Sequence, residues 1–296
     1  MILSRKPVYD RTPKISICIP AYKAPQFFKR VIDSVTVQEY TDYEIIVTDD
    51  SPDDSIRDIL AATTLPVPFT YVRNAERLGP PGNWNRAVGL AKGEYIKILH
   101  HDDWLLSSRS LAQFVALMDA NPGAVMAFSS AEAYDQDQCL KFVHSPPIDR
   151  ITELRRDPRV LFFGNFIGPP SSIIYRNLSG VVFDEKLKWL VDIDFYIRLL
   201  EGKKSFSYSE EPLVGVTIDS SHQVTRECEN NKNVEVREYL YLYSKLLSEK
   251  RRFVRDSRFF SQLFERFSIT SCRELSELAP DVKIPWQLKL LVFLRV

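Results

Sequence analysis

The fold of this chain is constrained most by short apolar runs that alternate with helical patterns over the first 130 residues. The runs typical of buried strands are residues 15–19, 43–48, 67–72, 94–99 and 125–128. Between them, apolar side chains recur at helical spacing in residues 27–35, 54–62, 84–91 and 107–118. Strands joined by helices predict an α/β, Rossmann-like fold, a mostly parallel sheet flanked by helices.

The pattern is less regular after about residue 130. Strand-like runs at residues 172–175 and 213–218 lie on either side of a helical pattern at residues 190–200. From residue 233 onward, two apolar stripes at helical spacing indicate packed helices. We therefore expect an N-terminal extension, an α/β domain in two halves and a helical C-terminal region, with bounds at residues 1–13, 14–130, 131–225 and 226–296.

Charge and cysteine content argue against several classes of protein. The 39 basic and 39 acidic residues balance, so no global positive field favours nucleic acid. The four cysteines are scattered without a C-x-x-C pair, which is typical of reduced thiols in a cytosolic protein. The N-terminus lacks the apolar core of a secretory signal, and no apolar run is long enough to span a bilayer. We expect a cytoplasmic location.

Polar residues follow three of the predicted strands directly. They are Pro20 to Tyr22, Asp49 with Asp50, and His100 to Asp103. In open α/β sheets, ligands bind beyond the carboxyl ends of the strands. We therefore expect these three groups to lie along one rim of the sheet.

The third strand end could hold a metal ion. Asp102 and Asp103 are adjacent carboxylates at a sheet edge, where they repel each other unless a cation is present. Mg²⁺ or Mn²⁺ would take one or two carboxylates together with diphosphate oxygens, and a ligand from His100 or His101 would favour manganese. The alternative is a strand end that is polar for solubility alone.

The second strand end could bind a nucleobase. A carboxylate of Asp49 or Asp50 can accept the imide N–H of uracil or thymine. The alternative is that Ser51 or Asp53 caps the following helix while the other side chains are solvated. The Gly-Pro-Pro-Gly run at residues 79–82 is predicted to form a turn.

Two side chains farther along the chain could also take part in catalysis or metal binding. Asp192 stands near the start of the helical pattern at residues 190–200, where a carboxylate is either a helix cap or a general base that deprotonates an acceptor hydroxyl. His222 lies in a polar loop, where a single histidine is more often structural or exposed than a metal ligand.

The C-terminal segment, residues 284–296, is short and strongly apolar but contains Lys289 and Arg295. One interpretation is a helix that packs on the domain or on a second copy. The other is a peripheral contact with the cytoplasmic face of the inner membrane, where lipid-linked acceptors reside.

Taken together and in order, these residues resemble the family 2 glycosyltransferases, which have the GT-A fold. The resemblance runs from about Ile15 to about Thr225. Its pieces are Ile19 to Tyr22, the strand end Val47 to Ser51, Asn85 followed by residues 91–96, Leu99 to Asp103, and Val191 to Asp194 leading to Arg198.

The resemblance implies an inverting transfer from a nucleotide-diphosphate sugar, a UDP- or dTDP-sugar, to a hydroxyl of a glycan or lipid-linked acceptor in surface polysaccharide biosynthesis. It makes residues 14–130 the nucleotide-sugar half and residues 131–225 the acceptor half. On the family pattern, the donor-binding residues are Pro20, Ala21, Tyr22, Asp49, Asp50, Asn85, His100 and His101.

The resemblance also assigns the metal ligands and the base. Asp102 matches the last carboxylate of the family's DxD motif, and Asp103 is its common companion; the metal would be Mn²⁺ or Mg²⁺. His222 is the nearest equivalent of a histidine expected near the end of the domain. Asp192 matches the general base that activates the acceptor hydroxyl.

The sequence departs from the family pattern at three positions. His100 stands where the first DxD aspartate is usual, Trp84 where an arginine commonly precedes the asparagine, and Val191 where a glutamate is frequent. None of these departures removes Asp102 or Asp192.

Two other functions share some of these features. A nucleotidyltransferase would have the same sheet and metal edge, but it would typically show a Gly-rich, basic phosphate loop near the first strand, which residues 20–26 lack. A non-catalytic nucleotide- or sugar-binding module would keep the Asp50 pocket without needing Asp192.

Overall fold

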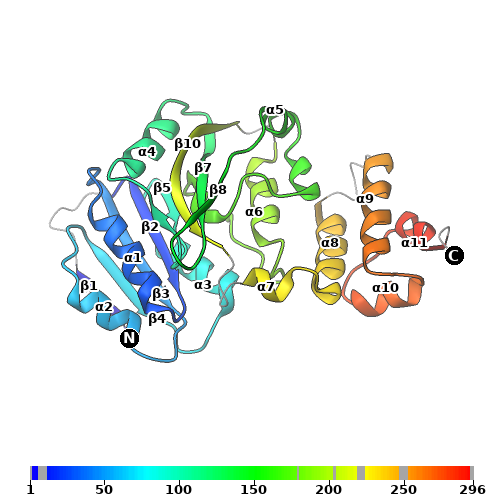
Figure 1. The fold of residues 1–296 in the computed structure, drawn as a ribbon, viewed down its shortest axis with the longest axis horizontal. Coiled ribbons are helices and arrows are strands. Elements are labelled where there is room, and N and C mark those ends of the chain that lie inside the picture. The colour runs from blue at the N-terminus through cyan, green and yellow to red at the C-terminus, as the bar shows by residue number, and fades with distance from the viewer. Residues whose placement is uncertain are drawn as a thin grey trace. The chain divides into compact units, whose positions relative to one another are not determined.

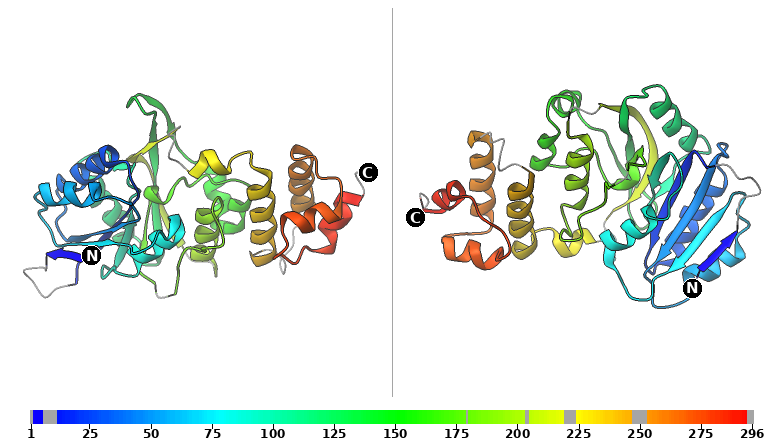
Figure 2. Two further views of the ribbon diagram at one scale, coloured as in Figure 1. Left: turned by 90° about the horizontal axis from the view of Figure 1, so that it is seen from below. Right: turned by 180° about the vertical axis from the view of Figure 1, so that it is seen from behind.

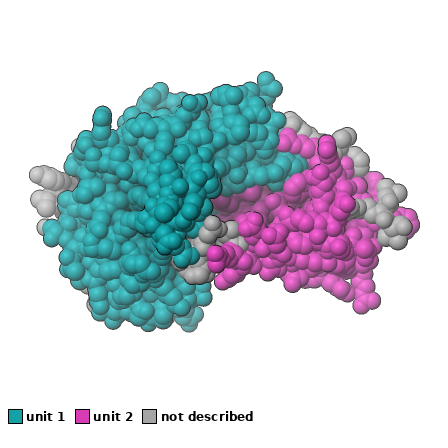
Figure 3. Space-filling model, viewed as in Figure 1, with its two compact units in different colours: residues 1–185, 195–220 teal, residues 186–194, 221–296 magenta. Residues whose placement is uncertain are grey.

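The computed structural model describes residues 2–5, 12–178, 180–202, 205–218, 224–246 and 253–293. The chain divides into two compact units (Figure 3). The first unit comprises residues 1–185 and 195–220, and the second comprises residues 186–194 and 221–296. The division places residues 186–194 with the C-terminal helices, whereas the sequence analysis put them in the α/β domain. The predicted domain bounds themselves stay a prediction.

A ten-stranded sheet forms the centre of the first unit among the described residues (Figure 1, Figure 2). The strand order is β1-β4-β3-β2-β5-β9-β7-β10-β6, and β8 pairs with β7. The strands are β1 (Ile2–Arg5), β2 (Ile15–Ala21), β3 (Tyr43–Asp49), β4 (Phe69–Arg73), β5 (Tyr95–Ile98), β6 (Trp104–Leu105), β7 (Ala124–Tyr134), β8 (Leu140–His144), β9 (Ile173–Arg176) and β10 (Ser205–Thr217).

The predicted α/β alternation is confirmed for the first half of this sheet. Strands β4, β3, β2 and β5 are mutually parallel, and β7 and β10 form a second parallel pair. Strand β9 lies between the two groups and is antiparallel to both of its neighbours, while β1, β6 and β8 are antiparallel additions. The sheet is therefore mixed, although most of its central pairings are parallel.

Most helices of the first unit come from the predicted amphipathic segments, but those within residues 148–163 and 170–172 lie where the sequence analysis predicted none. The helices are α1 (Pro25–Thr36), α2 (Ser55–Ala62), α3 (Gly79–Val88), α4 (Ser110–Asp119), α5 (Ile148–Arg156), the short 3-10 turns η1 (Pro158–Phe163) and η2 (Pro170–Ser172), and part of α6 (Val191–Leu200). The turn predicted at residues 79–82 is wrong, because these residues are the first turn of α3. Proline fits there, since the first N–H groups of a helix have no intrahelical partner.

One glycine brings β5 into register beside β2. A Cβ atom on Gly93 would lie 2.5 Å from the backbone nitrogen of Ser16, so only glycine allows this approach. Beyond this contact, the side chains of β2 and β5 are buried. The close pairing fixes where β5 ends, and the polar residues of the predicted rim follow directly.

The second unit is helical in its described part. Its helices are α7 (Val224–Cys228), α8 (Lys232–Leu246), α9 (Phe253–Arg266), α10 (Cys272–Leu278) and α11 (Trp286–Phe293), together with the first turn of α6. The predicted stripes are buried at Val236, Leu240 and Tyr243 of α8 and at Phe260 and Phe264 of α9. No helix in the described residues is long and apolar enough to cross a membrane.

Candidate active site

The three predicted strand ends meet at one rim of the sheet. Ala21 pairs with Asp49 across β2 and β3, and the backbone N–H of Asp50 donates to the carbonyl of Ala21 at 3.0 Å. On the other side of β2, the N–H of Leu99 donates to the carbonyl of Cys18 at 2.9 Å. The parallel register therefore brings the segments after β2, β3 and β5 together, as predicted.

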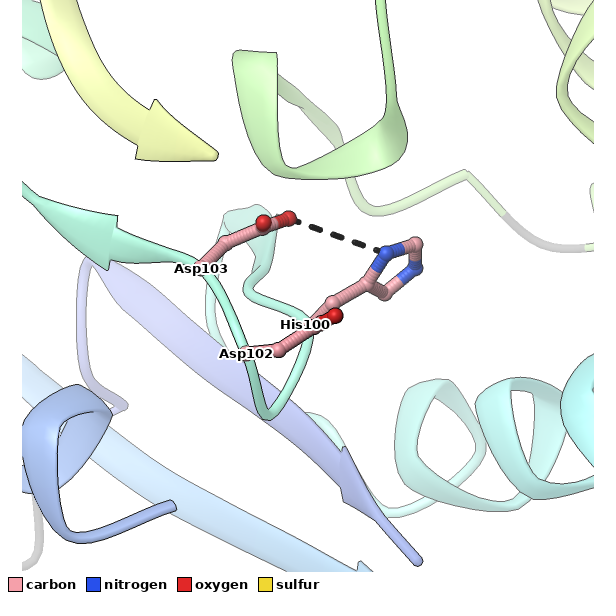
Figure 4. A group of neighbouring side chains, drawn as sticks. All are labelled: His100, Asp102 and Asp103. Carbon is pink, nitrogen blue, oxygen red and sulfur yellow. Dashed lines mark ion pairs between the residues drawn. The ribbon is translucent and has the colours of Figure 1, made fainter. Parts of the chain in front are cut away.

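His100, Asp102 and Asp103 converge just after β5 (Figure 4). One ligand atom from each lies within 4.8 Å of the others, and the Nδ1 atom of His100 is 3.8 Å from Oδ2 of Asp103. Both carboxylates are buried. Among the described residues, the Nε2 atom of His100 is buried without a hydrogen-bond partner.

The electrostatics of this group favour a bound cation. Burial and the charge of Asp102 raise the pKa of Asp103 well above its usual value, so its negative charge is poorly compensated. Burial lowers the pKa of His100 to about 4, which keeps the imidazole neutral and its nitrogen lone pair available. Two carboxylates and a neutral imidazole fit a divalent cation such as Mn²⁺ or Mg²⁺.

The backbone of Asp102 is held from two distant parts of the chain. Its carbonyl accepts hydrogen bonds from Nη2 of Arg30 at 2.7 Å and from Oγ1 of Thr217 at 2.6 Å. The guanidinium of Arg30 lies 3.7 Å from the ring centroid of Trp104. A Cβ atom on Gly215 would lie 2.3 Å from that ring, so Trp104 packs directly on the β10 backbone. These contacts fix the loop that carries both carboxylates.

A buried lysine holds the other side of the same loop. Nζ of Lys97 donates to the carbonyls of Ser171 and, at 3.2 Å, Ile173. The hydroxyl of Ser171 accepts the N–H of His100 at 2.9 Å and also bonds to the carboxylate of Asp103. Burial lowers the pKa of Lys97 to about 7, while the charge of Asp103 opposes that shift. Lys97 thus supports two of the three candidate ligands through Ser171.

A cavity of about 490 Å³ lies at the β2 and β3 end of the rim. It is lined by Tyr22, Lys23, Asp50, Ser51, Pro52, Arg73, Asn74, Ala75, Glu76 and Arg77. The guanidinium of Arg77 lies 4.2 Å from the ring centroid of Tyr22. An aromatic ring, two carboxylates and three basic side chains are suitable for a planar, polar ligand that carries negative charge.

Asp50 also organises the wall of this cavity. Its Oδ1 atom accepts the side-chain N–H of Asn74 at 2.7 Å and the backbone N–H of Leu78 at 3.2 Å. Its Oδ2 atom accepts the backbone N–H of Gly79 at 2.9 Å. One carboxylate therefore ties the strand end to the segment that leads into α3.

Not all predicted donor-binding residues face this cavity. The Asp49 carboxylate is fully buried and accepts the Ser51 N–H and the Tyr71 hydroxyl, and burial raises its pKa. The amide of Asn85 exchanges hydrogen bonds with the backbone of Phe183. These bonds direct both side chains into the protein.

The remaining predicted residues lie around the rim. Pro20 and Ala21 are buried at the end of β2, and His101 is half-buried beside Asp102. Trp84, in place of the expected arginine, packs on the ring of His100 with 4.7 Å between ring centroids. His222 lies outside the described residues, so its proposed ligand role stays a prediction.

The sequence analysis missed the residues that support the rim, namely Arg30, Lys97, Ser171 and Thr217. A charged Lys97 within the apolar β5 run was the one local signal. Arg30, Ser171 and Thr217 lie tens of residues from the loop that they contact, and no local pattern marks them.

Asp192 belongs to the second unit, in the first turn of α6. It is half-buried, and its Oδ1 atom accepts the backbone N–H of Ile193 at 2.9 Å. Asp194 is fully buried and pairs with Lys245 of α8 at 2.7 Å. The first turn of α6 is therefore attached to α8, and the role of Asp192 as a base remains a prediction.

Comparison with known proteins decides the family. The model described as "Glycosyl transferase family 2" matches residues 16–176, which is more than half of the chain and includes the whole rim. The chain belongs to glycosyl transferase family 2. It is therefore a glycosyltransferase, as the resemblance implied, and the alternatives of a nucleotidyltransferase or a non-catalytic module are not supported.

Relatives of this family 2 glycosyltransferase occur in several bacteria. An uncharacterized Mycobacterium tuberculosis protein is 31% identical over 201 residues, covering 64% of this chain and 62% of that protein. The putative colanic acid biosynthesis glycosyl transferase WcaA of Escherichia coli is 27% identical, covering 64% and 66%. The GalNAc(5)-diNAcBac-PP-undecaprenol beta-1,3-glucosyltransferase of Campylobacter jejuni is 26% identical, covering 56% and 53%. The chain thus spans less than two thirds of the length of each of these relatives.

Solved structures show the same fold. TarS 1–349 of S. aureus, in complex with UDP-GlcNAc, has a TM-score of 0.60 at 15% identity, covering 86% of this chain and 73% of that chain. The mannosyltransferase PcManGT of Pyrobaculum calidifontis, in complex with GDP-Man and Mn²⁺, has a TM-score of 0.52 at 14% identity, covering 98% and 71%. The glycosyltransferase described here therefore has the predicted GT-A fold.

Proposed function

We propose that this protein is an inverting, metal-dependent glycosyltransferase that uses a UDP- or dTDP-sugar. The observation that carries the proposal is the rim itself, where a nucleotide-sized cavity and a group of candidate metal ligands follow neighbouring strands. A nucleotide-diphosphate sugar combines a planar base, two phosphates and a sugar. The rim offers matching chemistry for the base and the phosphates.

The base would bind in the cavity beside Asp50. The Tyr22 ring provides a face for stacking, and a carboxylate at this position can accept the imide N–H that uracil and thymine share. Arg73 and Arg77 add positive charge for the phosphates. The assignment of Pro20, Ala21, Asp49, Asn85, His100 and His101 to donor binding remains part of this proposal.

Asp102 and Asp103, with His100, would hold the cation. When bound, Mn²⁺ or Mg²⁺ would neutralise the diphosphate and act as a Lewis acid on the leaving group. The buried setting of these residues suits the task, because burial raises the pKa of Asp103 and a bound cation would stabilise its ionised form.

Asp192 would act as the general base. Its carboxylate would take the proton of an acceptor hydroxyl while the hydroxyl oxygen bonds to the anomeric carbon and the bond from that carbon to the diphosphate breaks. A single displacement of this kind inverts the anomeric configuration, and no covalent enzyme intermediate is required.

The acceptor would be a glycan or lipid-linked sugar in surface polysaccharide biosynthesis. Support comes from the names of two relatives, one assigned to colanic acid biosynthesis and one to an undecaprenol-linked acceptor. A cytoplasmic location, in part at the inner membrane, follows from this choice of acceptor.

Helix α11 would provide the membrane contact. It buries Leu288 and Val292, while Trp286, Leu290 and Phe293 are exposed on its surface at a spacing of four and three residues. Such an exposed apolar stripe suits the lipid interface. Flotation with anionic vesicles tests this contact: the full chain should float, and a variant with all three residues changed to serine should remain in the soluble fraction.

The central experiment measures donor turnover. Purified protein is incubated with Mn²⁺ and a panel of UDP-glucose, UDP-galactose, UDP-N-acetylglucosamine and dTDP-rhamnose, with water as the acceptor of the sugar, and the release of nucleoside diphosphate is followed. We expect release from at least one donor, and a loss of roughly 10²- to 10⁴-fold in Asp192→Asn with donor binding retained. Equal turnover by both proteins would remove Asp192 from the role of base.

A further inference from the structure

A buried carboxylate of the second unit binds the backbone just ahead of α6. Glu238, on α8, is 3% exposed. Its Oε1 atom accepts the backbone N–H of Lys188 at 2.6 Å, and its Oε2 atom accepts those of Trp189 and Leu190, each at 2.9 Å. Three consecutive N–H groups therefore converge on one side chain that lies about fifty residues farther along the chain.

The position of these N–H groups explains why an anion binds there. They belong to the three residues just before Val191, the first residue of α6, so they lie outside the hydrogen-bond ladder of the helix and need another acceptor. The helix dipole adds partial positive charge at the same end. An ionised carboxylate can accept all three bonds at once, whereas a protonated one would present a donor to other donors.

The three bonds fix the segment that carries Asp192. Asp192 follows Leu190 by two residues, and Asp194, another two residues on, pairs with Lys245 of the same helix α8. Helix α8 therefore holds the chain both before and after Asp192. Each of these contacts lies inside the second unit.

We propose that Glu238 is a positioning residue for Asp192. This inference rests on the proposed function, in which Asp192 is the general base. Glu238 itself touches no substrate. It sets the direction of the first turn of α6, and a displacement of about 1 Å there would cost on the order of 100-fold in rate.

The test uses Glu238→Gln in the full chain, with Glu235→Gln as the matched control. Glu235 lies one turn earlier on α8 and is similarly buried, but it accepts the N–H of Asn230 and pairs with Arg266. With the panel donor that the wild-type protein turns over, we expect Glu238→Gln to lower kcat roughly 10- to 100-fold with little change in donor KM. Glu235→Gln should stay within about twofold of the wild type.

A double-mutant cycle separates positioning from general stability. If Glu238 acts through Asp192, Glu238→Gln should cause no further loss of kcat in an Asp192→Asn background. An equal loss in both backgrounds would overturn the proposal, and so would a kcat for Glu238→Gln that matches the wild type. If Asp192→Asn alone has no effect, the proposed base itself is wrong, which is a different result.

Folding is checked by circular dichroism and thermal unfolding of each variant. Glu238→Asp provides the second variant if the glutamine variant does not fold, because it keeps the charge on a shorter side chain. We expect Glu238→Asp to retain a higher kcat than Glu238→Gln. Any loss of kcat that Glu238→Asp causes in the wild-type background should be absent in the Asp192→Asn background. A Glu238→Asp loss that persists in that background would contradict the positioning role.

Discussion

The rim after β5 and the first turn of α6 carry the two halves of the proposed chemistry, and the fold supports them with opposite charges. At the rim, the groups that need partners are carbonyls, and the cations Arg30 and Lys97 donate to them. At the start of α6 they are N–H groups, and the anion Glu238 accepts from them. The end of a strand and the start of a helix expose different backbone atoms, so each requires a different buried charge.

The comparison also shows how differently the two regions could be predicted. His100, Asp102 and Asp103 are nearly consecutive, so their meeting needs only a strand that stops. The setting of Asp192 depends on Glu238 and Lys245, about fifty residues away. If the rim serves binding and the start of α6 serves catalysis, changes at the rim should alter cation and donor binding, and changes near α6 should alter turnover alone.

The largest expected effect at the rim comes from Asp102→Ala. Loss of a carboxylate ligand should weaken Mn²⁺-dependent donor binding by roughly 100-fold or more. Isothermal titration of UDP with and without Mn²⁺ measures this, with Asp137→Ala on an exposed hairpin turn as the control. Unchanged titration curves for Asp102→Ala would remove this residue from the metal site.

Asp50→Asn should have the next largest effect and should act on the nucleotide rather than the metal. An amide cannot accept all three N–H bonds, so the segment leading into α3 should shift and UDP affinity should fall roughly tenfold. The loss should appear with and without Mn²⁺. Asp53→Asn in the same loop is the control; a loss seen only with Mn²⁺ would mean that Asp50 serves the metal site.

Arg30→Met should weaken Mn²⁺ binding by about tenfold, because Arg30 holds the Asp102 loop through the carbonyl of Asp102. The methionine keeps part of the contact with Trp104 but removes the bonds that the guanidinium donates to Asp102, Thr217 and Gln138. Titration of Mn²⁺ into the protein with UDP present measures the change. Arg57→Met, on the exposed side of α2, should leave affinity unchanged, and equal losses in the two variants would contradict a specific role.

Lys97→Met should change the pH dependence of stability more than it changes binding. The pKa of Lys97 is about 7 in the folded protein and near 10.5 when unfolded, so the unfolded state binds more protons between these values. This residue should make the free energy of unfolding rise with pH in that window, by at most about 1.4 kcal/mol per pH unit. Urea unfolding at pH 7, 8 and 9 with a chelator should show a shallower rise in Lys97→Met. Parallel curves for the two proteins would contradict the lowered pKa.

The sequence by itself determined the strand ends and hence the rim. The apolar runs show where β2, β3 and β5 stop, and the helical segments between them predict that the strands are parallel. The amino-acid pattern alone therefore places Tyr22, Asp50 and Asp102 near one another. The order of these pieces also indicated the family. Residues 79–82 were misassigned because proline and glycine are typical of both turns and helix starts, and the chain context decides between the two.

Only the tertiary structure decided which side chains support those positions. Thr217 reaches the carbonyl of Asp102 across 115 residues, and Glu238 reaches the N–H groups ahead of α6 across about fifty. Local patterns show which backbone groups a strand end or helix start leaves open, but not which distant side chain packing will bring to them. That choice depends on where β10 and α1 pack within the first unit and where α8 packs within the second, which no single stretch of the sequence specifies.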